Sequence, residues 1–139
     1  MTQLEQARDL LEAHDSIVFA MLFGSLARNT AHPWSDADIG IYVTRPWSLL
    51  ETGKLAASLE TALGRTVDLC VLNVALERNP LLAYRVIAEG KLLFCRDPDI
   101  FADVKARIIL HYLDTSFLRT MVMNAFRERL ESGQFGKGG

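Results

Sequence analysis

The sequence predicts an α/β fold, a small mixed β-sheet of about four strands flanked by helices and followed by C-terminal helices. Three observations predict it. Four short apolar runs of strand length lie within the first 96 residues, and helical patterns separate most of them. After residue 96 only helical periodicity remains. The chain has 139 residues, half of them hydrophobic, which is enough to bury the core of one domain.

The predicted elements follow from two patterns. Apolar residues that recur three and four positions apart indicate helices, and short continuous apolar runs indicate buried strands. The predicted strands cover residues 16–23, 37–43, 65–72 and 91–95. The predicted helices before residue 96 cover residues 4–13, 48–63 and 80–89. Gly64 and Gly90 follow the last two of these helices, in the position where glycine commonly ends a helix.

A Gly-Ser turn closes the first predicted strand. Gly24 breaks the apolar run, and the segment from Ser25 to Arg28 could open a short helix with Ser25 as its N-cap. Glycine lets a backbone approach a ligand closely, and the free N–H groups of a helix start attract anions. Taken alone, however, a Gly-Ser pair is more simply explained as a turn and a cap.

The C-terminal third has a different character. Residues 97–130 predict one long helix or two, with a break near residues 114–115. Its broad apolar side either packs on the sheet or forms part of a partner surface. The candidates for such a surface are Tyr112, Phe117, Leu118, Met121 and Phe126. We therefore expect a core at residues 1–96, a helical extension of the same domain at 97–131 and a flexible tail at 132–139.

Composition limits the function classes. The formal net charge of −2 provides no basic field for binding nucleic acid polymers. No apolar run approaches the roughly 20 residues of a membrane span, and the N-terminus lacks a signal-peptide pattern, so no membrane partner is expected. Cys70 and Cys95 lie in apolar runs and are expected to be core thiols. Nothing requires an oxidising compartment, so the cytoplasm is the expected location.

Three aspartates interrupt apolar strands. Asp36 and Asp38 stand two residues apart at the start of the second strand, so both side chains should point to one face, and Asp68 lies in the third strand. Neighbouring carboxylates repel unless a positive charge lies between them. That charge could come from arginines such as Arg28 or Arg65, or from a divalent cation. Carboxylate oxygens suit Mg²⁺, and the sequence supplies no thiolate or histidine cluster for zinc.

Together these features resemble a known family signature. Gly24 to Arg28 (GSLAR), then six residues, then residues 35–41 (SDADIGI), is similar to the motif of the DNA polymerase β-like nucleotidyltransferase superfamily. The short chain and the arginine after the Gly-Ser turn resemble the minimal nucleotidyltransferases (MNT), the antitoxins of HEPN/MNT toxin–antitoxin pairs. Asn29 departs from the motif, where glycine is common, although asparagine tolerates a positive φ better than most residues.

The resemblance implies a nucleotidyltransferase fold and a catalytic site for two metal ions. Asp36 and Asp38 would hold two Mg²⁺ ions, and Asp68 would complete the metal site and help to deprotonate the attacking hydroxyl. Gly24 and Ser25 would hold the β- and γ-phosphates of a nucleoside triphosphate. All of these roles are carried over from the family motif.

For Arg28 the resemblance leaves two roles open, a further phosphate contact or a brace for a carboxylate. The family implies ATP as the donor and a tyrosine hydroxyl of the cognate HEPN ribonuclease toxin as the acceptor, with AMP addition blocking the toxin. Two alternatives stay open. One is a non-catalytic antitoxin that inhibits its partner by binding, and the other is a nucleotidyltransferase acting on a small molecule such as an aminoglycoside.

Overall fold

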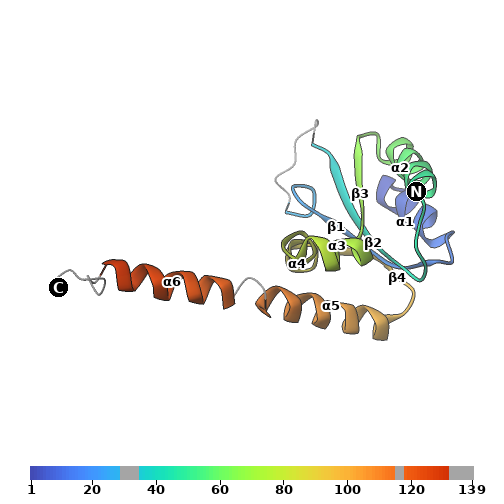
Figure 1. Ribbon diagram of the computed structural model, residues 1–139. Coiled ribbons are helices and arrows are strands. Elements are labelled where there is room, and N and C mark those ends of the chain that lie inside the picture. The colour runs from blue at the N-terminus through green and yellow to red at the C-terminus, as the bar shows by residue number, and fades with distance from the viewer. Residues whose placement is uncertain (29–34, 115–117, 132–139) are drawn as a thin grey trace.

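The protein is described by a computed structural model that covers residues 1–28, 35–114 and 118–131, without the side chains of Leu118 and Met121 (Figure 1). The helices of these ranges are α1 (Gln3–Glu12), α2 (Leu49–Leu63), α3 (Leu72–Arg78), α4 (Pro80–Glu89), α5 (Pro98–Tyr112) and α6 (Leu118–Glu131). The strands are β1 (Ile17–Phe23), β2 (Ala37–Val43), β3 (Val67–Val71) and β4 (Lys91–Cys95). The predicted tail at 132–139 lies outside the described residues.

The four strands form one mixed sheet in the order β3-β2-β1-β4. β1 pairs antiparallel with both β2 and β4, whereas β2 and β3 run parallel. The parallel pair requires a crossover, and α2 supplies it. The predicted fold class, a mixed sheet of about four strands flanked by helices, is confirmed.

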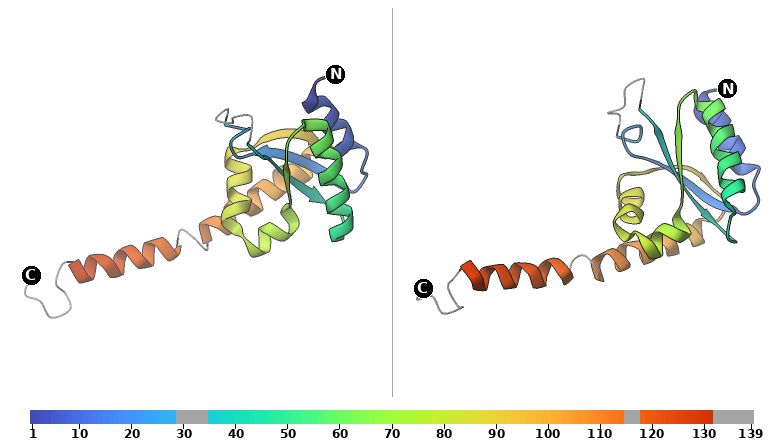
Figure 2. Two further views of the ribbon diagram at one scale, coloured as in Figure 1. Left: turned by 90° about the horizontal axis from the view of Figure 1, so that it is seen from above. Right: turned by 45° about the horizontal axis from the view of Figure 1, so that its top comes forward.

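Helices cover both faces of this sheet. Figures 1 and 2 show α1 and α2 on one face, and α3, α4 and the start of α5 on the other. Each face has its own apolar cluster, one around Ile39 and Ile41 and the other around Phe19 and Val86. All seven residues of β1 are buried between the two layers, which explains why its sequence is continuously apolar.

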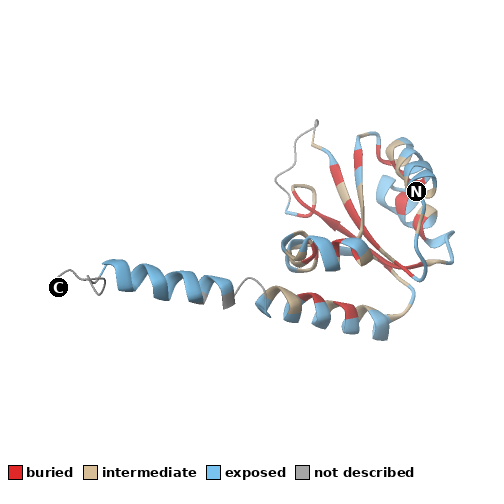
Figure 3. Cartoon of the chain, viewed as in Figure 1, coloured by how far each residue is buried: buried red, intermediate tan, exposed pale blue. Residues whose placement is uncertain are grey.

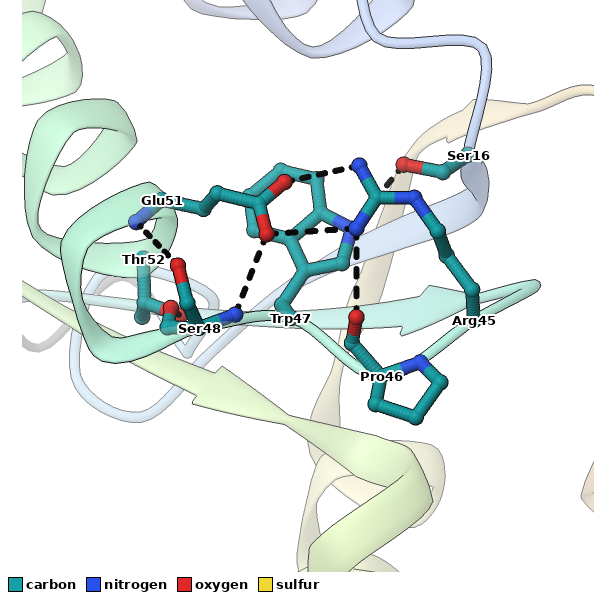
Figure 4. Close-up of polar contacts among 7 residues, drawn as sticks. All are labelled: Ser16, Arg45, Pro46, Trp47, Ser48, Glu51 and Thr52. Atoms are coloured by element: carbon teal, nitrogen blue, oxygen red, sulfur yellow. Dashed lines mark hydrogen bonds and ion pairs between the residues drawn. The ribbon is translucent and has the colours of Figure 1, made fainter.

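Polar contacts fix the connection from β2 to α2 (Figure 4). Ser48 caps α2 in a capping box with Glu51, and the Arg45 guanidinium binds both Glu51 oxygens at 2.7 and 3.2 Å. The hydrogen bonds from Arg45, which has the largest effect, and from the Ser48 backbone lower the pKa of Glu51 to about 2. Trp47 Nε1 donates a hydrogen bond of 2.9 Å to Ser16 Oγ, which joins the connection to the start of β1. The crossover therefore begins at a defined position.

Two local predictions are wrong. The third strand ends at Val71, and residues 72–78 form α3, a helix that the sequence pattern does not indicate. The segment from Ser25 to Arg28 forms turns instead of a short helix, with a bond of 3.2 Å from the Arg28 N–H to the Gly24 carbonyl. Gly24 adopts a positive φ of 75°, a conformation that favours glycine and bends the chain at the end of β1.

The two C-terminal helices differ in whether they pack on the core. α5 packs on the core through Val104 and Ile108, and Tyr112 stacks on Tyr84 with ring centroids 4.1 Å apart. α6 extends away from the sheet, and its described residues are exposed (Figures 1 and 3). α5 ends at Tyr112 and α6 begins at Leu118, and the predicted break near 114–115 borders residues 115–117, which lie outside the described residues.

The apolar side of α6 still has no assigned role. Exposed apolar residues on it are Val122, Met123, Phe126 and Leu130. Phe117, named above for a partner surface, lies outside the described residues, as do the side chains of Leu118 and Met121. The grouping of residues 97–131 with the core as one domain stays a prediction. Among the described helices, none combines the length and apolar character of a membrane span.

Candidate active site

Asp38 and Asp68 stand side by side on the parallel strands β2 and β3, paired in register. Side chains two apart in a strand share a face, so Asp38 lies on the same face as Gly40, and Asp68 on the same face as Cys70. A Cβ on Gly40 would meet Val86 of α4 and Leu72 of α3. Cys70 packs in the cluster beneath these helices. Both carboxylates thus lie on the α3–α4 face.

The Gly24 bend lies directly against Asp38. Phe23, the last residue of β1, is paired with Asp38 in the sheet, and Gly24 follows with its positive φ. A Cβ atom built on Gly24 would collide with the Asp38 carboxylate. The predicted phosphate turn and the predicted acidic pair are therefore neighbours in space, although the six residues between their motifs lie outside the described ranges.

The pKa of Asp38 responds to the charged groups around it. The pKa of Asp38 is raised by burial first, and then by the negative charges of Asp68 and Asp36. The guanidiniums of Arg85 and Arg28 oppose this shift. Asp38 and Asp68 are therefore adjacent, and the charges of Asp36, Arg28 and Arg85 reach the Asp38 carboxylate. No sequence pattern assigns Arg85 to this site.

The arginines near the site are bound to other partners. Arg28 Nη1 lies 3.7 Å from Glu89 Oε1, and Arg85 Nε lies 3.8 Å from Glu89 Oε2. Arg65 Nη1 donates a 3.0 Å hydrogen bond to the Ser35 carbonyl. Within the described part of the chain, no ion pair joins any of the three aspartates to an arginine. Arginine pairing thus does not explain why these acids lie together.

The donor set fits a hard divalent cation. The Asp38 carboxylate lies against the Gly24 bend, and Asp36 and Asp68 are exposed, so a ligand from solvent can reach them. Yet no group of three His, Cys, Asp or Glu side chains in the described ranges is arranged to hold a metal ion. The predicted pair of Mg²⁺ ions therefore stays a prediction, and it requires the exposed carboxylates to turn inward.

Arg85 and Glu89 are the site residues that sequence reasoning missed. Both lie on α4, whose bounds the sequence predicts, and they form an i,i+4 pair that is common on exposed helices. Nothing in that spacing shows that the end of α4 lies beside β1 and β2. The sequence therefore gives no signal that places these two residues at the site.

A separate pocket of about 430 Å³ opens at the other end of the β2–β3 pair. Val43 and Val71, the last residues of these strands, line it. Two of its polar side chains are engaged in structural bonds, since Asn73 binds both backbone groups of Val43 and Arg45 binds Glu51. We therefore assign the chemistry to the acidic end of the sheet.

Comparison with known proteins agrees with this assignment. The family model described as "Polymerase beta, Nucleotidyltransferase" matches residues 5–99. A Methanocaldococcus jannaschii protein that bears the name "putative protein adenylyltransferase" is 39% identical over 71 residues, which are 51% of this chain and 73% of that protein.

Solved structures share the fold. A chain from a toxin–antitoxin crystal structure with AMP-PNP superposes with a TM-score of 0.74 at 24% identity, covering 89% of this chain and 98% of that one. A chain from the complex of tri-AMPylated Shewanella oneidensis HEPN toxin with MNT antitoxin gives 0.70 at 21%, covering 90% and 96%. Both alignments extend beyond the family match into the C-terminal helices.

Proposed function

Because this chain belongs to the polymerase β nucleotidyltransferase family, we propose that it transfers AMP from ATP to a tyrosine hydroxyl of a cognate HEPN ribonuclease toxin and so neutralises it. The observation that carries the proposal is the in-register pairing of Asp38 with Asp68, with the Asp38 carboxylate packed against the Gly24 bend. The relative named as a protein adenylyltransferase and the structural neighbours from toxin–antitoxin complexes support the acceptor class. We place the reaction in the cytoplasm, where ATP is abundant and thiols such as Cys70 stay reduced.

In this proposal Asp36, Asp38 and Asp68 hold two Mg²⁺ ions. Bound Mg²⁺ would polarise the α-phosphate and stabilise the charge on the entering and leaving oxygens. Asp68 accepts the proton of the attacking tyrosine hydroxyl. The tyrosine oxygen then forms a bond to the α-phosphorus, the bond from this phosphorus to the bridging oxygen breaks, and pyrophosphate leaves.

The Gly24 bend holds the rest of the nucleotide. Gly24 lets the backbone approach the triphosphate without a side chain in between, and the Ser25 hydroxyl donates to a phosphate oxygen. Arg28 follows in the same turn and supplies a guanidinium for the β- and γ-phosphates. These groups fix the chain of phosphates so that the α-phosphorus faces Asp68.

A transfer assay tests the proposal. The protein is mixed with ATP labelled at the α-phosphate, Mg²⁺ and the HEPN protein encoded beside it, and the labelled toxin is digested and mapped. We expect label on a toxin tyrosine with the wild type and none with the Asp36→Asn/Asp38→Asn variant. Asp103→Asn is the matched control, because Asp103 lies on α5 with its side chain 70% exposed. Unlabelled toxin with the wild type, or full labelling by the double variant, would contradict the proposal.

Inhibition by binding alone is the second candidate, and the exposed apolar side of α6 favours it. It predicts that a variant with all three aspartates changed to asparagine still co-purifies with the toxin and still blocks its ribonuclease activity. The catalytic proposal predicts that this variant binds the toxin without neutralising it. A ribonuclease assay of the co-purified complex therefore separates the two.

A further inference from the structure

We infer that Glu89 is a positioning residue of this site, which holds the guanidiniums of Arg28 and Arg85 near Asp38 for contact with the triphosphate. The inference rests on the proposed function and goes beyond it. It concerns a residue outside the family motif on which the sequence analysis relied. It also makes Arg85 a second nucleotide contact next to Arg28.

Glu89 joins two cations that come from different parts of the fold. Arg28 ends the turn after β1, and Arg85 lies one helical turn before Glu89 on α4. One carboxylate oxygen faces each guanidinium, at 3.7 Å to Arg28 and 3.8 Å to Arg85. Both guanidiniums also lower the pKa of Asp38, against the rise that burial and the neighbouring aspartates cause. Two like charges are thus held together next to the catalytic acids by a single carboxylate between them.

One oxygen of Glu89 is buried although its side chain as a whole is 31% exposed. Its Oε2 atom is buried and has no hydrogen-bond donor in range among the described residues, because Arg85 Nε stays too far away. A buried carboxylate oxygen without a donor is costly, whereas an exposed i,i+4 pair contributes only a few tenths of a kcal/mol. A stable helix does not need this arrangement, so we assign it to the site.

The end of α4 is fixed firmly enough to position a side chain. Val86 is fully buried beneath the helix. Gly90 follows Glu89 so closely against β1 that a Cβ at residue 90 would collide with the Val86 carbonyl and crowd Met21. The backbone of Glu89 is therefore held against the strand that leads into the Gly24 bend.

The physical role follows from charge. Without the carboxylate, the two guanidiniums repel each other, and their flexible side chains move apart into solvent. With it, both stay near the bend, yet at 3.7–3.8 Å neither is bound so tightly that a phosphate cannot displace it. A triphosphate that enters the bend then meets two prepositioned guanidiniums, which suit its doubly charged end.

ATP binding to the whole protein tests the inference without requiring transfer. Dissociation constants for ATP with Mg²⁺ are measured by calorimetry for the wild type, Glu89→Gln, Arg85→Gln and Asp103→Asn. We expect Glu89→Gln and Arg85→Gln each to weaken binding roughly ten-fold, the effect of one lost charge-assisted hydrogen bond. Asp103→Asn removes a comparable i,i+4 pair with Arg107 on α5, and it should leave the affinity unchanged.

A double-variant comparison separates positioning from a general structural effect. If Glu89 acts through the arginines, Glu89→Gln should add little further loss in an Arg28→Gln/Arg85→Gln background. In the transfer assay, KM for ATP should rise while kcat changes little. Unchanged ATP affinity in Glu89→Gln or in Arg85→Gln overturns the inference. A wild type that binds ATP but labels no toxin overturns the proposed function and leaves this test valid.

Discussion

The Asp38 carboxylate fills the space in which a Cβ atom at residue 24 would lie. The bend after β1 and the second acid of β2 are therefore packed against each other through a glycine. Because Phe23 pairs with Asp38 in the sheet, this contact is set by strand register and not by a flexible loop. The position of the proposed phosphate turn is thus tied to the position of Asp38, one of the proposed metal ligands.

Gly24→Ala should abolish transfer and destabilise the fold. The substitution forces an L side chain into a φ of 75° and into the Asp38 carboxylate. The left-handed backbone alone costs about 1–2 kcal/mol, and the collision adds to it. The change in the free energy of unfolding is measured by urea denaturation, and transfer by the labelling assay.

Gly53→Ala is the matched control for that variant. Gly53 lies inside α2, and a Cβ there meets nothing within 4 Å. Alanine favours the helix by about 0.5–1 kcal/mol, so the control should be stabilised and keep full activity. Equal stability of the two alanine variants would show that residue 24 is not constrained by Asp38.

Asn73→Ala should destabilise the protein without touching the active site. The Asn73 amide accepts a 2.9 Å bond from the Val43 N–H and donates a 2.8 Å bond to the Val43 carbonyl, which ties α3 to the end of β2. Losing both leaves part-buried backbone groups unpaired, at a cost of about 1–3 kcal/mol.

Val74, the residue after Asn73, serves as the reference for Asn73→Ala. Val74 is 51% exposed, so Val74→Ala should change the unfolding free energy by less than about 0.5 kcal/mol. ATP affinity should be unchanged in both variants, since the Asn73 contact lies at the opposite end of the sheet from Asp38. A loss of ATP affinity in Asn73→Ala alone would contradict this separation.

Glu51 should make stability depend on pH at acid values. Its folded pKa of about 2 lies below the ordinary value of 4.5, so its ionised form stabilises the folded state. That stabilisation is complete above about pH 4.5 and is lost as the pH falls towards 2. The difference in Tm between wild type and Glu51→Gln should follow this course.

Glutamine keeps a capping-box amide at the third helical position and removes only the charge, so the comparison isolates the ion pair with Arg45. Because both side chains are exposed, 1 M NaCl should shrink the difference at pH 7. A Tm difference that persists unchanged down to pH 2 would mean that Glu51 is not ionised against Arg45.

Removal of α6 should leave the core as stable as before. None of its described side chains is buried, and the helix extends away from the sheet (Figure 2). A chain that ends at Leu113 keeps the α5 contacts of Val104 and Ile108, so its Tm should match that of the full chain. A clear fall in Tm would show that α6 supports the core.

The elements predicted best are those whose sequence signals are local. β2, α4 and β4 have the predicted bounds, because proline, glycine and polar residues stand at their ends. α3 was missed because it follows the apolar run of β3 directly and its seven residues are too few to show a helical period. Its start depends on a tertiary contact, the bond from Asn73 to the end of β2, which no local pattern contains.

In the candidate site, too, local patterns predict some positions and tertiary packing decides the others. The two-residue period of a strand predicts Asp36 and Asp38 on one face, but β2 begins at Ala37 and contains only Asp38, so that placement stays a prediction. The pairing of Asp38 with Asp68 required the parallel register of β2 and β3. Arg85 and Glu89 could not be placed at all, because the packing of α4 brings them to the site.

By itself, the sequence determined the mixed sheet, its flanking helices and the set of acids, since periodicity and the Gly-Ser…Asp-x-Asp spacing are properties of short segments. Only the tertiary structure decided which side chains meet. It put the Gly24 bend against Asp38, aligned Asp68 with it and brought the end of α4 alongside. The physical reason is that strand pairing and helix packing join residues distant along the chain, and their register comes from burial of the whole core.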